Sequence, residues 1–328
     1  MRVLMLNHNQ EQFGTYFRCR FLAEEMAKRG HQVTLVCASG KSFSVRIERR
    51  RLSDNLTLVT LPRIRYHKYF TGQLVRMVIA CVHVLRHSYD VVHAFTVAQP
   101  QIGIPAYLYH RTKRGGLVVD WDDLWGRDGF GRYHARPIRW VLETFERRIP
   151  LLADKVTVVS HFLKKEAIKA GVPFGRIVLL PNGVNQEAIQ SEDRLSARAT
   201  LNLPEEMKLV VSLGNTYTEG LELLLKGFQR VRTQLPAAQL VLVGAVSVPK
   251  HARDDAVTLG QHLRIVGTVP YEQAMRYLAA ADVVALPMAQ DPIEEARFPI
   301  RLGDYLAAGR PIVSNAVGEV KRVLDDYG

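Results

Sequence analysis

The sequence has 328 residues, of which 47% are hydrophobic and 23% are charged. This composition is typical of a globular protein with about two domains, and no apolar run reaches the roughly 20 residues that span a bilayer. The three cysteines show neither close pairing nor metal-ligand spacing, and the N-terminus lacks a signal peptide's long apolar core. We therefore expect a cytoplasmic protein.

The net charge of +12 is unevenly distributed along the chain. Residues 1–183 contain 29 Lys and Arg against 14 Asp and Glu, whereas residues 184–328 contain 15 against 18. A basic half favours an anionic partner: nucleic acid, an anionic membrane surface or an anionic substrate. No known nucleic-acid module appears among these basic residues, so nucleic acid is the least favoured of the three.

Short β-rich runs alternate with helical stretches throughout. The first half contains predicted strands at 2–6, 32–36, 56–61, 90–93, 117–120, 155–159 and 177–180. The second half contains predicted strands at 208–213, 240–243, 263–266, 283–286 and 311–314. Repeated strand-helix-strand units predict two doubly wound α/β domains with mainly parallel sheets, in which ligands bind at the carboxyl ends of the strands.

The loop after the first strand contains Gly14 alone, where a dinucleotide-binding domain has Gly-x-Gly-x-x-Gly. This loop therefore argues against a nicotinamide enzyme. Backbone N–H groups at the start of the following helix, with Arg18 one turn in, form a candidate anion site. An ordinary strand-to-helix turn is the alternative explanation.

Residues 63–87 combine basic and aromatic side chains with an apolar stretch at 74–85. The ordinary interpretation is a helix whose apolar face lies in the core. The alternative is an interfacial patch that binds anionic lipid. Its members would be Arg63, Arg65, Lys68, Arg76, Tyr66, Tyr69 and Phe70.

Three carboxylates and two tryptophans follow the predicted strand 117–120, at Asp120, Trp121, Asp122, Asp123 and Trp125. Carboxylates accept hydrogen bonds from sugar hydroxyls, and indole rings pack on sugar rings. A divalent-metal site is a rival interpretation, because oxygen ligands also suit magnesium. A helix-capping Asp beside a core Trp is the third alternative.

The turn Pro181-Asn182-Gly183 and the polar segment after it indicate a boundary between a first domain, 1–183, and a second domain, 184–328. Near the C-terminus, residues 297–313 predict a helix followed by a buried strand. Gly309 stands where a left-handed residue ends a helix. Asp304 falls in the middle of that helix.

Read position by position, the chain resembles the retaining glycosyltransferases of family 4, also called group 1, which have the GT-B fold. The matching segments are Arg29-Gly30-His31-Gln32-Val33, Asp90-Val91-Val92-His93, Pro181-Asn182-Gly183-Val184 and Ala281-Asp282-Val283 to Pro287. Their order and spacing extend over essentially the whole chain. The resemblance implies two Rossmann-like domains that face each other across a cleft, the first binding the acceptor and the second the nucleotide-sugar donor.

The family carries a Glu-x7-Glu motif on the helix near the donor. The resemblance places Asp304 at the second Glu, which accepts hydrogen bonds from the ribose hydroxyls. The first Glu would fall at Ala296, so Glu295 is the nearest candidate catalytic carboxylate. Backbone N–H groups at Phe298, Ile300 and Arg301 would face the diphosphate.

The family also clamps the donor phosphates with an Arg and a Lys. After Gly214 this chain has Asn215 and Glu219 at those places, so both cations are missing. We predict that Arg297 and Arg301 replace them.

The resemblance implies a retaining hexosyltransferase that moves a sugar from a UDP- or GDP-sugar to a glycan or lipid-linked acceptor. With the basic first half, we expect it to act at the inner face of the plasma membrane. The resemblance implies no cofactor and no obligatory metal. His93 and Asp122 are further candidate catalytic residues. The alternatives are a nucleotide-sugar epimerase or hydrolase on the same fold, or a degenerate domain that binds nucleotide without turnover.

Since family members usually continue through further helices, we expect the chain to be truncated at its C-terminus.

Overall fold

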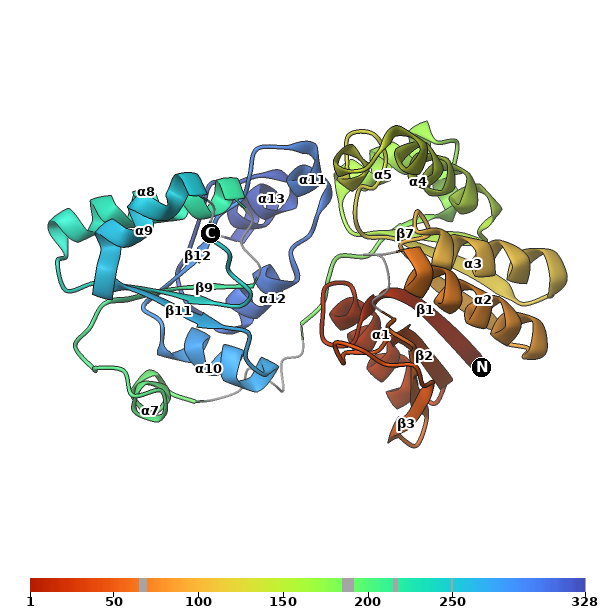
Figure 1. Cartoon of the computed structure of the whole chain (residues 1–328), viewed down its shortest axis with the longest axis horizontal. Helices are drawn as coiled ribbons and strands as arrows, with labels where there is room; N and C mark the ends of the chain where they lie inside the picture. Colours follow the sequence, from red (N-terminus) through yellow and green to blue (C-terminus); the bar gives the residue numbers. More distant parts are fainter. Residues whose placement is uncertain (65–69, 185–191, 215–217, 249, 328) are drawn as a thin grey trace. The chain divides into compact units, whose positions relative to one another are not determined.

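The chain forms two compact units (Figure 1). The structure is a computed structural model that describes residues 1–64, 70–184, 192–214, 218–248 and 250–327. Unit 1 comprises Met1–Asn182 together with the short stretch Glu295–Phe298, and unit 2 comprises Gly183–Glu294 and Pro299–Gly328. A tetrapeptide from the second half of the sequence is therefore part of the first unit.

Unit 1 contains an eight-stranded sheet in the order β3-β4-β2-β1-β5-β6-β7-β8, in which only β3 is antiparallel to its neighbour. Its strands are β1 (Arg2–Gln10), β2 (Gln32–Ala38), β3 (Glu48–Ser53), β4 (Leu56–Leu61), β5 (Val91–Phe95), β6 (Gly116–Trp121), β7 (Lys155–Val158) and β8 (Ile177–Leu179). Its helices are α1 (Tyr16–Lys28), α2 (Phe70–Arg86), α3 (Pro100–Thr112), α4 (Arg136–Arg148) and α5 (His161–Lys169), with 3-10 turns at Phe130–Tyr133, Ile149–Leu152 and Phe174–Arg176.

The inner strands of unit 1, such as β1, β2 and β5, are largely buried on both faces, which is why they read as apolar runs. Side chains alternate along a strand, so Val3 and Met5 of β1 pack in the cluster that contains α1. Leu4 and Leu6 point to the other face, into the cluster that contains residues of α2 and α3. The sheet therefore has a helical layer on each side.

Unit 2 contains a five-stranded, all-parallel sheet in the order β11-β10-β9-β12-β13. Its strands are β9 (Leu209–Leu213), β10 (Gln239–Val243), β11 (Leu263–Gly267), β12 (Val283–Leu286) and β13 (Ile312–Ser314). Its helices are α7 (Arg194–Thr200), α8 (Thr218–Gln234), α9 (Arg253–Leu259), α10 (Tyr271–Ala280), α12 (Ile300–Ala307) and α13 (Gly318–Tyr327), with 3-10 turns at Lys250–Ala252 and Gly260–His262. Helix α11 (Pro292–Ala296) lies at the point where the chain passes from unit 2 into unit 1.

The predicted fold class, two doubly wound parallel-sheet domains, is confirmed. Each predicted strand has a counterpart, and the helix before β13 ends as predicted, with Gly309 at φ +61°. Strand β3 was not predicted, because its sequence ERRRLS has few apolar residues and it lies at the sheet edge, where it pairs only with β4.

Two glycines of unit 2 allow a close backbone approach at the carboxyl ends of β9 and β10. Gly214 has φ +89° and Gly244 has φ +135°. A Cβ atom on Gly244 would lie 2.7 Å from the carbonyl oxygen of Gly214, which is backbone and cannot rotate away. This edge of the sheet is therefore free of side chains at both positions.

We expect Gly244→Ala to destabilise unit 2 by about 2 kcal/mol or more, because it combines strain at positive φ with a backbone clash. Gly227→Ala is the matched control. Gly227 lies in α8 with open space around its Cβ position, so alanine should stabilise the helix by about 0.5–1 kcal/mol. Differential scanning calorimetry measures both. Equal melting temperatures for the two variants would contradict this account.

Candidate functional site

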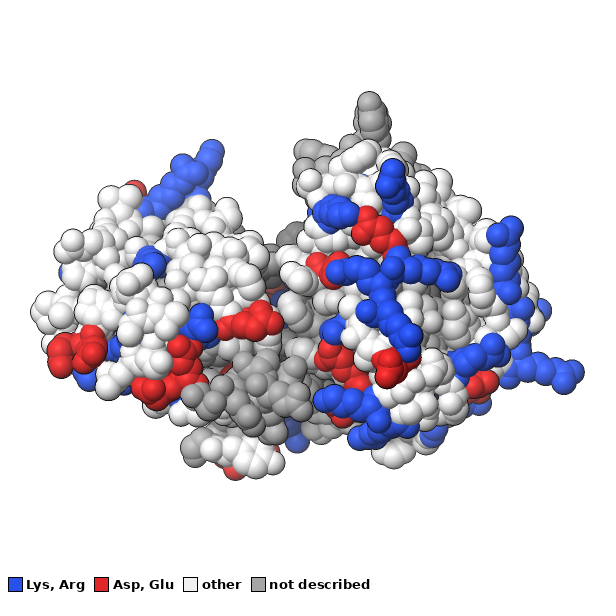
Figure 2. Space-filling model, turned by 90° about the horizontal axis from the view of Figure 1, so that it is seen from below, with Lys and Arg blue, Asp and Glu red and all other residues white. Residues whose placement is uncertain are grey.

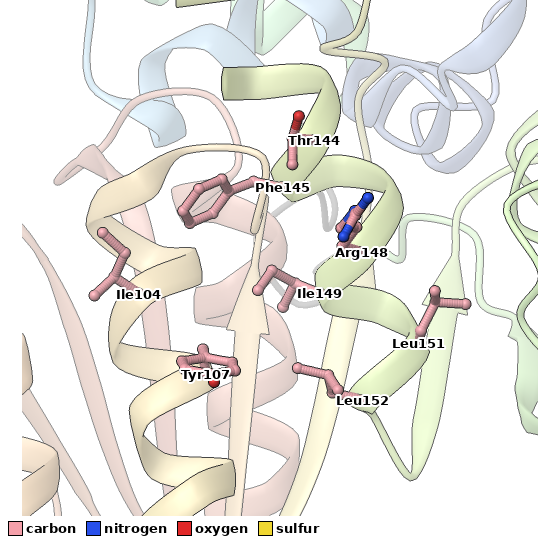
Figure 3. A pocket seen from close by; sticks show the side chains of 8 residues that line it. All are labelled: Ile104, Tyr107, Thr144, Phe145, Arg148, Ile149, Leu151 and Leu152. Carbon is pink, nitrogen blue, oxygen red and sulfur yellow. The ribbon is translucent and has the colours of Figure 1, made fainter. Parts of the chain in front are cut away.

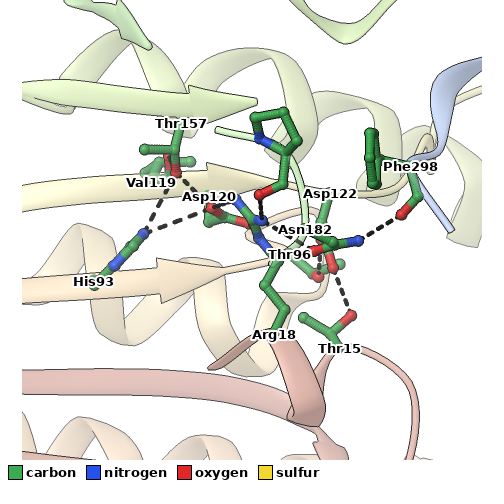
Figure 4. Close-up of polar contacts among 11 residues, drawn as sticks. Thr15, Arg18, His93, Thr96, Val119, Asp120, Asp122, Thr157, Asn182 and Phe298 are labelled. Atoms are coloured by element: carbon green, nitrogen blue, oxygen red, sulfur yellow. Dashed lines mark hydrogen bonds and ion pairs between the residues drawn. The ribbon is translucent and has the colours of Figure 1, made fainter. Parts of the chain in front are cut away.

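The three carboxylates at the end of β6 each take a different partner. Figure 4 shows Asp120 and Asp122 with theirs. Asp120 is fully buried and forms a bidentate pair with Arg18, with Nε–Oδ1 at 2.9 Å and Nη2–Oδ2 at 2.7 Å. Thr157 donates a further hydrogen bond to Asp120, and His93 Nε2 lies 3.7 Å from it. Burial would raise the pKa of Asp120, but Arg18 and His93 outweigh it and hold this pKa well below its usual value.

Asp122 lies at the centre of a second group of hydrogen bonds. The hydroxyl of Thr15 donates to Oδ2 at 2.5 Å, and the hydroxyl of Thr96 donates to Oδ1 at 2.7 Å. Thr96 adopts φ +59°, an uncommon conformation for a β-branched residue. Burial, followed by the charges of Asp123 and Asp120, raises the pKa of Asp122 to about 7.

Asp123 pairs with a residue from far along the chain. Arg297 Nε lies 2.9 Å from its Oδ1, and the Arg297 guanidinium lies 5.1 Å from the centre of the Phe130 ring. Two further hydrogen bonds hold the same stretch, from Ser160 Oγ to the carbonyl of Ala296 and from Asn182 Nδ2 to that of Phe298.

The structure brings several sequence-predicted residues of unit 1 into one network. Arg18 is 3% exposed and also donates to the Pro181 carbonyl and to Asn182, so its guanidinium is enclosed by protein partners. His93 is buried within the same network. Gly14 lies beside it in the loop before α1, with φ +55°.

Two other predicted residues belong to the stretch Glu295–Phe298. Glu295 is exposed, whereas Phe298 is partly buried and packs against the core of unit 1 together with the fully buried Ala296. No described group of three or more His, Cys, Asp and Glu side chains has an arrangement that could hold a metal ion.

In unit 2 the predicted donor residues lie at the carboxyl edge of the sheet. Arg301 donates from Nη1 to the Leu213 carbonyl at 2.8 Å and lies beside Gly214. It belongs to the first turn of α12, which begins at Ile300. Asn215 lies outside the described residues.

Asp304, on the same helix, is 5% exposed. The phenol of Tyr271 donates to its Oδ1 at 2.7 Å. Burial raises the pKa of Asp304 to about 6, and the hydrogen bond from Tyr271 opposes that rise. Asp304 is thus a buried carboxylate whose Oδ1 accepts a hydrogen bond from Tyr271.

Sequence reasoning missed Thr15, Thr96, Asn182 as a hydrogen-bonding residue, and Tyr271. Thr15 follows Gly14 at the start of a helix, and Tyr271 follows a proline at the start of α10, which are weak local signals. Thr96 comes directly after β5, and this position at the carboxyl end of a strand could have marked it as a candidate site residue.

A separate cavity of about 500 Å³ opens between α3, α4 and the turn Ile149–Leu152 (Figure 3). Its lining is largely apolar, with Arg148 as the one charged side chain, and includes none of the sequence-predicted site residues. It therefore contributes nothing to the polar networks above.

Two doubly wound α/β units define the GT-B class of glycosyltransferase folds, and sequence comparison supports the same class. The model of a "Glycosyl transferase 4-like domain" matches residues 14–183, and that of "Glycosyl transferases group 1" matches residues 207–327. The chain belongs to the family-4, or group 1, glycosyltransferases.

Curated relatives agree with this membership. An uncharacterized glycosyltransferase of Methanocaldococcus jannaschii is 24% identical over 95% of this chain and 78% of its own length. The lipopolysaccharide 1,2-N-acetylglucosaminetransferase of Salmonella typhimurium is 25% identical over 59% of this chain and 52% of its own. The chain thus spans about half the length of the second relative.

Solved structures share the fold. Sucrose-phosphate synthase from Thermosynechococcus elongatus aligns with a TM-score of 0.74 at 21% identity, over 98% of this chain and 83% of its own. The Anabaena protein HepE, solved with UDP and glucose, aligns with a TM-score of 0.68 at 17% identity over 98% and 83%.

Asp122 provides a test of the network in unit 1. Because its pKa is about 7 in the folded chain and 3.8 in the unfolded chain, the folded state binds this proton more tightly. The stabilisation that comes from protonated Asp122 is complete below about pH 4 and is lost as the pH rises to about 7. Asp122→Asn removes the titration. Between pH 5 and 7, the free energy of unfolding of wild type should therefore fall by up to about 2 kcal/mol relative to that of this variant.

Denaturant unfolding at several pH values measures that difference. Asp128→Asn, at an exposed aspartate of the same loop, is the control for removing one negative charge. A wild-type to Asp122→Asn difference that stays constant with pH would exclude the proposed titration.

Proposed function

We propose that the protein transfers a sugar from a UDP- or GDP-sugar to a glycan or lipid-linked acceptor, with retention of the anomeric configuration. Family membership supports the transfer itself. The donor class is supported by HepE, which was solved with UDP and glucose. The acceptor class is supported by the Salmonella relative, a lipopolysaccharide N-acetylglucosaminetransferase.

The observation that carries the donor assignment is the carboxyl edge of the unit 2 sheet. Gly214 and Gly244 place no side chain on this edge, and Arg301 supplies a cation beside Gly214 that can bind a diphosphate. Asp304 supplies a hydrogen-bond acceptor three residues after Arg301 on the same helix. A phosphate-sized anion and a hydroxyl-bearing sugar can be held there together.

In the reaction we propose, Arg301 and the first N–H groups of α12 stabilise the leaving diphosphate. The acceptor hydroxyl attacks from the same face of the sugar and passes its proton to a leaving phosphate oxygen. No metal or cofactor takes part. Arg297 contributes once it exchanges Asp123 for phosphate, and Glu295, Asp122 and His93 remain the candidate catalytic side chains.

An anionic membrane surface is the partner we propose for unit 1, at the inner face of the plasma membrane. None of the described helices is long and apolar enough to cross a bilayer. However, α2 has no acidic residue and exposes an apolar stripe of Leu74, Val78, Val82 and Leu85 at helical spacing. Arg65, Tyr66, Lys68 and Tyr69 of the predicted patch lie outside the described residues.

Cations accompany that stripe. Arg49 of β3 acts electrostatically on His83 of α2. Arg76 of α2 is half-buried and donates a hydrogen bond to the Pro62 carbonyl, so it is not one of these cations. Figure 2 shows Lys and Arg side chains gathered on the face of unit 1 that includes β3. Apolar side chains flanked by cations are the combination that interfacial helices use.

Vesicle co-sedimentation tests the membrane partner. Wild type should bind vesicles that contain about 30% phosphatidylglycerol more strongly than neutral vesicles, with binding reduced by salt. Val78→Ser/Leu85→Ser should weaken binding about tenfold, since each substitution removes apolar area from the interface. Leu223→Ser, an equally exposed leucine on α8, is the control and should bind as wild type. Equal binding to neutral vesicles would contradict a role for anionic lipid.

A nucleotide-release assay tests the reaction. The protein is incubated with UDP-, GDP- and ADP-sugars, with and without membrane lipid extract. We expect release that depends on the extract, reduced about tenfold or more by Arg301→Gln and unchanged by Arg253→Gln at an exposed arginine of unit 2. Release without extract would indicate a hydrolase, binding without release a degenerate domain, and an altered donor sugar an epimerase.

A further inference from the structure

The buried carboxylate of Asp304 has an unusual environment. It is 5% exposed, and the hydrogen bond from Tyr271 to Oδ1 is the one that the described residues give its side chain. Oδ2 has no partner among them. Burial and this one bond account for the raised pKa of Asp304, and no cation contributes to it.

The carboxylate of Asp304 receives fewer hydrogen bonds than it can accept. An ionised carboxylate offers about four acceptor sites, and burying it without partners is costly. Its second oxygen is therefore suited to a donor that arrives with a ligand. A hydroxyl group fits, because it donates one hydrogen bond to the carboxylate without requiring the second charge that an amine would bring.

Tyr271 is placed to control where that oxygen points. It is the first residue of α10, which follows β11, whereas Asp304 belongs to α12, which follows β12. The phenol thus joins two helices that both begin at the carboxyl edge of the unit 2 sheet. A 2.7 Å hydrogen bond to Oδ1 restricts the rotation of the Asp304 side chain and so fixes the direction of Oδ2.

The side-chain length makes this restriction useful. Asp is one methylene shorter than Glu, and its carboxylate stays close to the helix axis. A short carboxylate reaches fewer ligand positions, so its orientation determines which hydroxyl it meets. A tyrosine held at the start of the neighbouring helix provides that orientation before the ligand binds.

We propose that Tyr271 is a positioning residue that holds Asp304 so that Oδ2 accepts a hydrogen bond from the 2′-hydroxyl of the donor nucleotide. The pair makes the site selective for ribonucleotides over 2′-deoxyribonucleotides. This inference rests on the proposed function, because it requires unit 2 to bind a nucleotide.

Calorimetric titration tests the pair. UDP, GDP and ADP are titrated into the full chain, and the tightest of them is compared with its 2′-deoxy analogue. Wild type should prefer the ribonucleotide by about tenfold or more, which corresponds to one hydrogen bond to a charged group. Tyr271→Phe keeps the ring and removes the hydroxyl, so affinity for the ribonucleotide should fall about tenfold while affinity for the deoxynucleotide changes less than about twofold.

A second variant and a control complete the design. Asp304→Asn leaves an oxygen for Tyr271 and replaces the other acceptor by an N–H donor, so it should lose the same discrimination. Tyr327→Phe, at a tyrosine of unit 2 that is 84% exposed, should bind as wild type. Thermal unfolding of each variant reports whether unit 2 remains folded.

The outcomes separate the two levels of the proposal. If Tyr271→Phe weakens both nucleotides equally, or neither, the positioning role is wrong while nucleotide binding stands. A wild-type protein that binds a ribonucleotide and its deoxy analogue equally also overturns it. If wild type binds no nucleotide, the proposed function fails and this inference fails with it.

Discussion

The buried ion pair between Arg18 and Asp120 is the interaction on which the polar interior of unit 1 depends. Both side chains are almost completely removed from water, so each charge is stable only because the other is present. Removing one partner of such a pair typically costs about 3–5 kcal/mol, because the remaining charge is left buried and uncompensated. The same guanidinium binds the Pro181 carbonyl and Asn182, so the pair also fixes the end of the Met1–Asn182 segment.

The ionisation of the neighbouring carboxylates follows from that pair. Asp120 has its own cation and remains charged. Asp122 is buried two residues away with only hydroxyl donors, and the charges of Asp120 and Asp123 act against its ionisation. Asp123 is partly exposed and takes Arg297 as its cation. Three carboxylates within four residues therefore have three different electrostatic environments, set by which cation each can reach.

The sequence predicts the sheets well because hydrophobic periodicity is local. Apolar residues reveal each buried strand within about five residues, whereas β3 was missed because it contains three consecutive arginines and few apolar residues. The site is harder to predict, because its interactions are long-range. Arg18 meets Asp120 across 102 residues and Arg297 meets Asp123 across 174. From sequence both arginines looked like cations available for phosphate, and the carboxylates that bind them could not be identified by spacing. The predicted roles of the site residues in catalysis and donor binding stay predictions.

The membership of Glu295–Phe298 in unit 1 has a consequence for how the protein is made. Ala296 and Phe298 fill part of the unit 1 core, although they are synthesised after the Gly183–Glu294 segment of unit 2. Domains generally fold in order as the chain leaves the ribosome. Here the first domain cannot complete its core until almost 300 residues have been translated. Until then, apolar side chains of the unit 1 core remain uncovered. The growing chain depends on its own later residues, or on a chaperone, to prevent aggregation through this apolar surface.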